Sequence, residues 1–141
     1  MPAPNDYVEY ARWLGEQAFS GLLYGWPITL ALICVIVLAG VWQLRYYRSP
    51  ARLVCLLVPF VFPLLFLIWG TVMRVPPGSS PPSWPQTVLL VLFCAQLIAG
   101  ILSVILLVRA RWFSVCVVVF SLWSGYWCAL LAAMSVGGVW L

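Results

Sequence analysis

Residues 113–141 read FSVCVVVFSLWSGYWCALLAAMSVGGVWL. Almost every side chain in this stretch is apolar or small, and the stretch is long enough to cross a bilayer. Small residues recur in it at every fourth position, at Ser121, Gly125, Ala129, Ala133 and Gly137. Because lipid gives no hydrophobic drive for helix association, close backbone approach at small residues must supply the attraction. The stretch therefore predicts a membrane helix that packs through this small-residue ladder.

The rest of the helix surface sets limits on that packing. Trp123 and Trp127 lie two positions from ladder residues, about 200° round the helix, so the opposite side is bulky. Ser124, Cys128 and Ala132 lie next to the ladder and widen its small face. A strict four-residue repeat drifts around a straight helix. We therefore expect only two or three ladder residues to face any one partner.

Composition places the whole chain in a membrane. Of its 141 residues, 65% are hydrophobic and 7% are charged, whereas a soluble domain carries about 25% charged residues. The net charge of +4 is no sign of a nucleic-acid partner, because the arginines fall at the ends of predicted helices, where membrane topology explains them. We expect an integral membrane protein whose partner is the lipid bilayer.

The predicted fold is all-α, because helices satisfy their own backbone groups in lipid. Residues 1–20 form an N-terminal interfacial amphipathic helix, and residues 21–141 form an antiparallel bundle of four transmembrane helices. The spans cover about 22–44, 53–73, 86–108 and 113–140.

The N-terminal segment has a helical repeat of aromatic and aliphatic residues, at Tyr7, Tyr10, Trp13, Leu14 and Ala18. This pattern predicts a short helix that lies in the membrane interface as an anchor, or that docks a partner. A cleavable signal peptide is not expected, because acidic rather than basic residues precede the apolar run.

The start of the first span is rich in helix-modifying residues. Gly21 and Gly25 offer a small-residue contact. Pro27 costs little if the span begins near Tyr24, because it then falls in the first turn. It kinks the helix if the N-terminal helix continues straight into the span.

Prolines mark the second span and the loop after it. Pro59 and Pro63 lie one turn apart, and each removes a backbone hydrogen bond, so neighbouring helices must satisfy the freed carbonyls. The pair is a possible hinge or a static kink. Residues 74–86 hold five prolines, which predicts an extended, semi-rigid loop that serves as a connector or as a recognition strip.

The third span carries one strongly polar side chain near its middle, Gln96. A glutamine at that depth usually hydrogen-bonds across a helix interface, although it could line a polar path. Ala95, Ala99 and Ser103 form a second small-residue ladder on this span. The loop at residues 109–111 is so short that the third and fourth spans must be antiparallel neighbours.

The arginine distribution predicts orientation. The first and third loops hold Arg45, Arg48, Arg52, Arg109 and Arg111, and the N-terminal tail and second loop hold Arg12 and Arg74. The positive-inside rule then places the first and third loops in the cytoplasm, where their arginines contact lipid headgroups, and places both termini outside. Arginine without lysine, with abundant Trp, Ala, Gly and Pro, is typical of a GC-rich bacterial gene, so we expect a bacterial inner membrane.

The reactive groups of most enzymes are missing. The chain has no His and no Lys, and its three acidic residues all fall within the first 16 positions. No span therefore carries a carboxylate for proton relay or cation binding. The five cysteines occur singly, without a Cys-x-x-Cys pair. We expect a non-enzyme without catalytic residues, metal or cofactor.

Three functions remain as hypotheses. The first is an accessory, assembly or inhibitor-type subunit that packs against itself or a larger membrane protein. The second is a homo-oligomeric pore or lysis-type channel, with Gln96 on an uncharged path. The third is a small transporter of an uncharged or lipidic substrate, with the proline pair as its hinge. The helix layout does not decide between them, because a fold alone carries no function.

Overall fold

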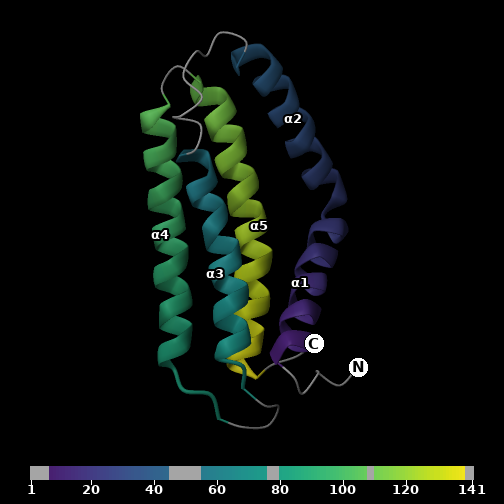
Figure 1. Ribbon diagram of the computed structural model, residues 1–141, viewed down its shortest axis with the longest axis vertical. Coiled ribbons are helices and arrows are strands. Elements are labelled where there is room, and N and C mark those ends of the chain that lie inside the picture. Colours follow the sequence, from purple (N-terminus) through teal and green to yellow (C-terminus); the bar gives the residue numbers. More distant parts are fainter. Residues whose placement is uncertain (1–6, 45–54, 76–79, 108–109, 139–141) are drawn as a thin grey trace.

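The computed structural model describes residues 7–44, 55–75, 80–107 and 110–138, and these ranges contain five α-helices and no strand. In chain order the helices are α1 (Tyr7–Tyr24), α2 (Trp26–Leu44), α3 (Val58–Val72), α4 (Trp84–Leu106) and α5 (Arg111–Gly137). The all-α prediction is confirmed for the described residues. Figure 1 shows α3, α4 and α5 side by side, with α1 and α2 following one another along the bundle on the side of α5.

Helix α5 is the centre of the fold. It has 27 residues and packs against all four other helices. One buried cluster joins it to α1, α3 and α4 through Ala18, Phe66, Leu89, Cys128 and Ala132, and Val136 extends it. A second cluster lies towards the other end, where Leu107 and Val117 pack with Leu56. The apolar core therefore runs along α5.

The helix ends follow from their local sequence. Pro59 and Pro85 lie in the first turns of α3 and α4, where a missing N–H costs nothing. Gly138 caps the end of α5 with a left-handed φ of 63°, and its N–H bonds back to the carbonyl of Ser135 at 3.4 Å. Glycine suits this cap because it has no Cβ to clash.

The helix boundaries differ in detail from the predicted spans. Helix α4 begins two residues before the expected 86, and α5 begins at Arg111 rather than at 113. The second span is described from residue 55, so its expected start at 53 lies outside the described residues. The first span is the largest difference, because residues 22–24 belong to α1 and the span proper begins with α2.

The chain bends by 83° between α1 and α2. The break falls at Gly25, and Pro27 is the second residue of α2. Thr29 Oγ1 donates a hydrogen bond of 3.0 Å to the carbonyl of Leu22, one of the carbonyls that a helix end leaves without an internal partner. Pro27 thus occupies the first-turn position, and α1 is a separate helix.

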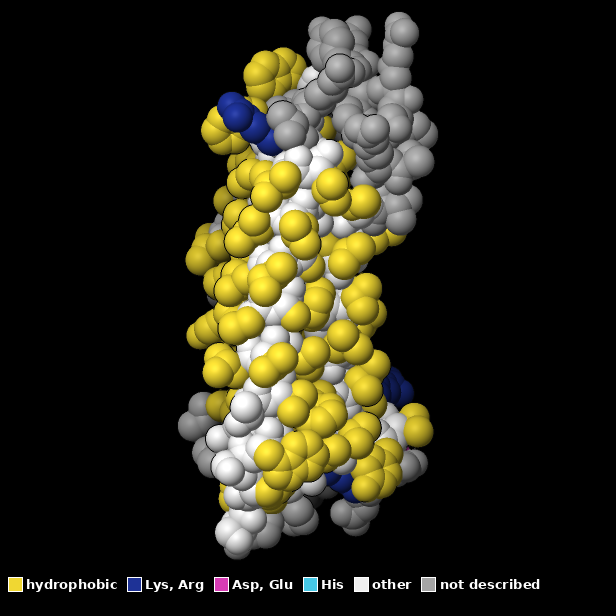
Figure 2. All heavy atoms as spheres, turned by 90° about the vertical axis from the view of Figure 1, so that its left-hand side faces the viewer, with side chains coloured by type: hydrophobic (Ala, Val, Ile, Leu, Met, Phe, Trp, Pro, Cys, Tyr) yellow, Lys and Arg dark blue, Asp and Glu magenta, His cyan; other side chains and the backbone are white. Residues whose placement is uncertain are grey.

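Several helices suit a bilayer. Cys55–Val72, Trp84–Leu106 and Arg111–Gly137 are each long and apolar enough to cross a membrane, and the bent pair of α1 and α2 adds a fourth candidate if it crosses as one span. Figure 2 shows hydrophobic side chains over the length of the face on the α4 side, with the basic side chains of the described residues towards its two ends. This distribution is that of an integral membrane protein.

Candidate functional site

Gln96 lies at the meeting point of α3, α4 and α5. Its side chain is fully buried. The Nε2 atom donates to the carbonyl of Ser121 at 3.0 Å and to the Ser121 hydroxyl at 3.2 Å. It also lies 3.5 Å from the carbonyl of Pro59. The Nε2 atom thus ties three helices together, whereas the buried Oε1 atom has no hydrogen-bond partner among the described residues.

The polar residues of α4 face the carbonyls that the prolines of α3 leave unpaired. Pro63 has no N–H to donate to the carbonyl of Pro59, and Gln96 donates to that carbonyl instead. Ser103 Oγ lies 3.1 Å from the carbonyl of Cys55, just before α3, and donates a shorter bond of 2.8 Å to the carbonyl of Ala99 in its own helix. A hinge at either proline would have to break these bonds. The hinge and the static kink both stay predictions.

The first two buried residues of the small-residue ladder of α5 pack against α4. Ser121 and Gly125 are both buried, and a Cβ added at Gly125 would clash with the carboxamide of Gln96. Ala129 is half-buried, Ala133 is exposed and Gly137 is half-buried. The ladder therefore turns away from the bundle after two residues, as its drift around the helix requires.

Where the ladder turns away from the bundle, α5 buries the small residues that lie beside it. Cys128, Ala132 and Ser135 take over the contact with α3. A Cβ added at Gly70 of α3 would lie 2.8 Å from the Cα of Ala132, so the two backbones approach closely there. On α4, Ala95 and Ala99 are half-buried and Ser103 is buried. Small residues on α4 and α5 thus serve packing within the chain.

A hydrogen-bond chain closes the end of the bundle where α1 begins. Ser135 Oγ donates to the carbonyl of Gly70 at 2.6 Å, and the Tyr10 hydroxyl lies 2.6 Å from the same Oγ. Because the Ser135 proton goes to Gly70, Tyr10 donates to Ser135. The Arg74 guanidinium lies 4.5 Å from the ring centre of Tyr7 and 5.1 Å from that of Tyr10. Sequence patterns gave no signal for the bond between Tyr10 and Ser135, because these residues are 125 positions apart.

The break between α1 and α2 is packed against tryptophans of α5. A Cβ added at Gly21 would lie 2.6 Å from the Trp127 ring, and one at Gly25 would clash with Trp123. Trp123 Nε1 donates to Thr29 Oγ1 at 3.0 Å. Sequence reasoning identified the glycines as a contact and the tryptophans as a bulky face. It did not foresee that the tryptophan rings pack against the glycines.

Helix α2 keeps an uncovered apolar side. Its contact side carries Leu32 and Ile36, which are half-buried, and Gly40, which is buried. On the other side a stripe of exposed residues follows the helix at steps of three, four and three, at Ala31, Cys34, Leu38 and Val41. We call these four residues the α2 stripe.

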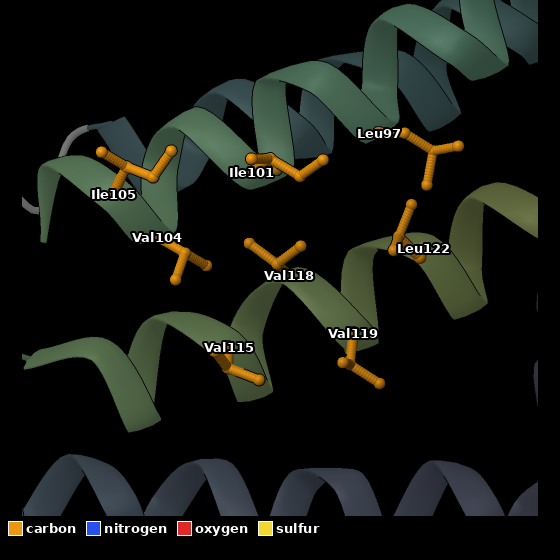
Figure 3. Close-up of a pocket in the computed structure, with 9 residues that line it drawn as sticks. Leu97, Ile101, Val104, Ile105, Val115, Val118, Val119 and Leu122 are labelled. Carbon is orange, nitrogen blue, oxygen red and sulfur yellow. The ribbon is translucent and has the colours of Figure 1, made fainter. Parts of the chain in front are cut away.

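The structure also holds a groove between α4 and α5. Its volume is about 240 Å³, and it is lined by Leu97, Gly100, Ile101, Val104, Ile105, Val115, Val118, Val119 and Leu122. Figure 3 shows the aliphatic side chains of both helices along it. We call this the α4–α5 groove. It offers shape and apolar contact but no polar group for chemistry.

The remaining predicted residues are placed only in part. Arg45, Arg48, Arg52 and Arg109 lie outside the described residues. Arg111 is exposed at the start of α5, and its guanidinium lies 5.8 Å from the ring centre of Trp112. Within the described ranges, no three His, Cys, Asp or Glu side chains gather as metal ligands would.

Comparison of the chain with protein-family models, with curated proteins and with solved structures finds no match. The function must therefore be argued from the packing of this chain alone.

Proposed function

We propose that this protein is a non-enzymatic membrane subunit that acts by packing the α2 stripe against a transmembrane helix of a larger membrane protein or of a second copy. The observation that carries the proposal is the contrast between the two sides of α2. One side holds the helix on α5, and the other leaves Ala31, Cys34, Leu38 and Val41 uncovered. A stripe at three- and four-residue steps is the geometry of a helix–helix seam.

The composition of the stripe supports a helix as its partner. Ala31 and Cys34 are small and lie next to one another on the exposed side, so a second backbone can approach closely there. Most small residues of α4 and α5 are buried or half-buried by contacts within the chain, with Cys94 and Ala133 as exposed exceptions. The accessible docking surface in this proposal is therefore on α2, and not on the small-residue ladder of α5.

The proposal includes four membrane spans, in which α3, α4 and α5 each cross and the bent pair of α1 and α2 crosses as one broken span. Helix α1 buries Tyr10, Leu14 and Ala18 against the bundle. Its outer side carries an exposed ion pair in which Arg12 and Glu16 are 3.0 Å apart. Charged groups facing lipid tails are costly, so the part of α1 that carries this ion pair suits the headgroup region.

The proposed location is a bacterial inner membrane with both termini outside. Helix α1 begins and α5 ends at the same end of the bundle, joined by the bond between Tyr10 and Ser135. Arg111 lies at the opposite end of α5, which the positive-inside rule assigns to the cytoplasm. Reporter fusions to both termini should both be active outside the membrane, and cytoplasmic activity of either would contradict the orientation.

The test is a native mass measurement on protein purified from its own membrane in mild detergent. We expect a second protein at fixed stoichiometry, or a second copy of the chain. Cys34→Phe should abolish that association, because its bulk holds the two helices apart. Cys94→Phe is the matched control, since Cys94 is also exposed but lies on α4. A monomer in the wild-type protein, or equal effects of both substitutions, would contradict the proposal.

The same native mass measurement distinguishes the proposed subunit from the pore hypothesis. A pore needs polar side chains that face a shared path, whereas Gln96, Ser103 and Ser121 all hydrogen-bond inside the chain. An assembly of four or more identical copies would nevertheless support a pore. Flux through liposomes that contain the pure protein would then be the next experiment, with Gln96→Leu as the variant expected to change it.

A further inference from the structure

The α4–α5 groove is narrow and closed at its base. The two helices touch at Gly100, where an added Cβ would lie 2.7 Å from a methyl of Val118. The side walls are branched aliphatic side chains that remain partly exposed, among them Ile101 on α4 and Val119 on α5. Figure 3 shows these walls on the two neighbouring helices. The groove therefore fits a thin apolar ligand that lies along the helices.

The lining of the groove suits an acyl chain. The groove holds about 240 Å³, and aliphatic side chains line it along both helices. A single flexible hydrocarbon chain can therefore follow it between α4 and α5.

A basic residue stands at one end of the groove. Arg111, Val115, Val118 and Leu122 follow one another at steps of four, three and four, so they share one side of α5. The last three line the groove, and Arg111 is exposed one turn beyond it. The exposed ring of Trp112 lies beside Arg111. Arginine and tryptophan are the side chains that meet lipid headgroups.

We propose that the α4–α5 groove binds one acyl chain of an anionic phospholipid, with the phosphate of its headgroup at Arg111. The apolar walls hold the chain, and Arg111 selects the charge of the headgroup. This site is separate from the α2 stripe and does not depend on the proposed function.

The probe is an equimolar mixture of phosphatidylglycerol and phosphatidylcholine, added to the full-length protein in mild detergent. Native mass spectrometry then counts the lipids that remain bound. We expect the wild-type protein to retain phosphatidylglycerol preferentially. Arg111→Gln should lower the ratio of retained phosphatidylglycerol to phosphatidylcholine about fivefold, the effect of one basic residue near an anionic surface. Arg111→Lys should keep the preference. Arg12→Gln is the control, since Arg12 is exposed on α1.

A second pair of variants tests the groove itself. Val119→Phe should fill it and lower the retention of both lipids, and Ile105→Phe serves the same purpose at a more exposed wall position. Leu90→Phe is the control, because Leu90 is exposed on α4 but does not line the groove. Circular dichroism identifies any variant that fails to fold.

Two results would overturn the proposal. An unchanged lipid ratio in Arg111→Gln would show that the headgroup is not selected there. Unchanged lipid retention in folded Val119→Phe and Ile105→Phe would show that no acyl chain occupies the groove. Loss of a dimer in those variants without loss of lipid would instead assign the groove to a second copy of the chain.

Discussion

The three-helix core of α3, α4 and α5 and the bent pair of α1 and α2 use their small residues differently. In the core, Gly70 and Gly125 admit a neighbouring backbone and a hydrogen-bonding carboxamide. In the bent pair, Gly21 and Gly25 admit the rings of two tryptophans. The core is thus held together by polar bonds and backbone approach, and its outer sides stay apolar and exposed, as at Leu64 and Ile101. The pair is attached from one side, which leaves the α2 stripe uncovered.

The largest effect is expected at Gly125. Gly125→Leu should destabilise the protein by about 3 kcal/mol, because its side chain must displace the buried Gln96 carboxamide. Thermal unfolding in detergent measures the loss. Gly15→Leu is the matched control, since no atom lies within 4 Å of a Cβ added at Gly15. Equal stability of the two variants would show that the core is not closed at Gly125.

The next largest effect on stability is expected at Gln96, which contacts the proline-containing helix α3. Gln96→Leu should cost about 1–2 kcal/mol, because it removes the bonds to Ser121 and Pro59. Adding Pro63→Ala should recover part of that loss, since alanine supplies the missing N–H to the carbonyl of Pro59. A double-mutant cycle by thermal unfolding measures the recovery. If the changes in the free energy of unfolding from the two substitutions are strictly additive, the two positions do not share the carbonyl of Pro59 as a bonding partner.

A smaller and local effect is expected at the attachment of the bent pair. Trp123→Phe removes the hydrogen bond to Thr29, worth about 0.6 kcal/mol. Amide hydrogen exchange at the start of α2 should then speed up about threefold, while exchange in α3 and α4 stays unchanged. Trp42→Phe, at an exposed position of α2, should alter neither region. Faster exchange throughout the molecule would show that the pair and the core unfold as one unit.

The smallest effect is expected on the α2 stripe. Leu38 is 69% exposed, so Leu38→Ala should change the stability of the isolated chain by less than about 0.5 kcal/mol. Leu14→Ala, at a fully buried leucine of α1, should cost about 2–5 kcal/mol under the same conditions. A comparable loss for Leu38→Ala would place the stripe inside the fold and remove it as a docking surface.

The sequence was sufficient to predict helices and their apolar character. Composition alone required helices in lipid, and the proline pair required outside donors for its carbonyls. Gln96 lies 3.5 Å from such a carbonyl, that of Pro59, and Ser103 lies 3.1 Å from the carbonyl of Cys55. Their pairing with Pro59 and Cys55 could not be predicted, because the crossing of α3 and α4 decides which side chain reaches which carbonyl.

The attachment of α1 and α2 was also beyond sequence reasoning. Gly21 and Gly25 were recognised as a contact surface, but a glycine pattern does not tell whether a backbone or an aromatic ring will fill it.

The drift of the small-residue ladder was foreseen from helix geometry. The partner of each ladder residue depended on the positions of α3 and α4. The proposed roles of the ladder, of the prolines and of the arginine loops stay predictions.

The central claim is that α2 presents a docking surface and the core does not. The most direct test is cysteine crosslinking in native membranes, with chains that keep only Cys34 on the α2 stripe or only Cys94 on α4. A short bismaleimide can join Cys34 only to a cysteine close to the stripe, so a partner chain must supply such a cysteine, as a second copy does. We predict a crosslinked species of defined mass with Cys34 and none with Cys94. Crosslinking through Cys94 but not through Cys34 would contradict the account.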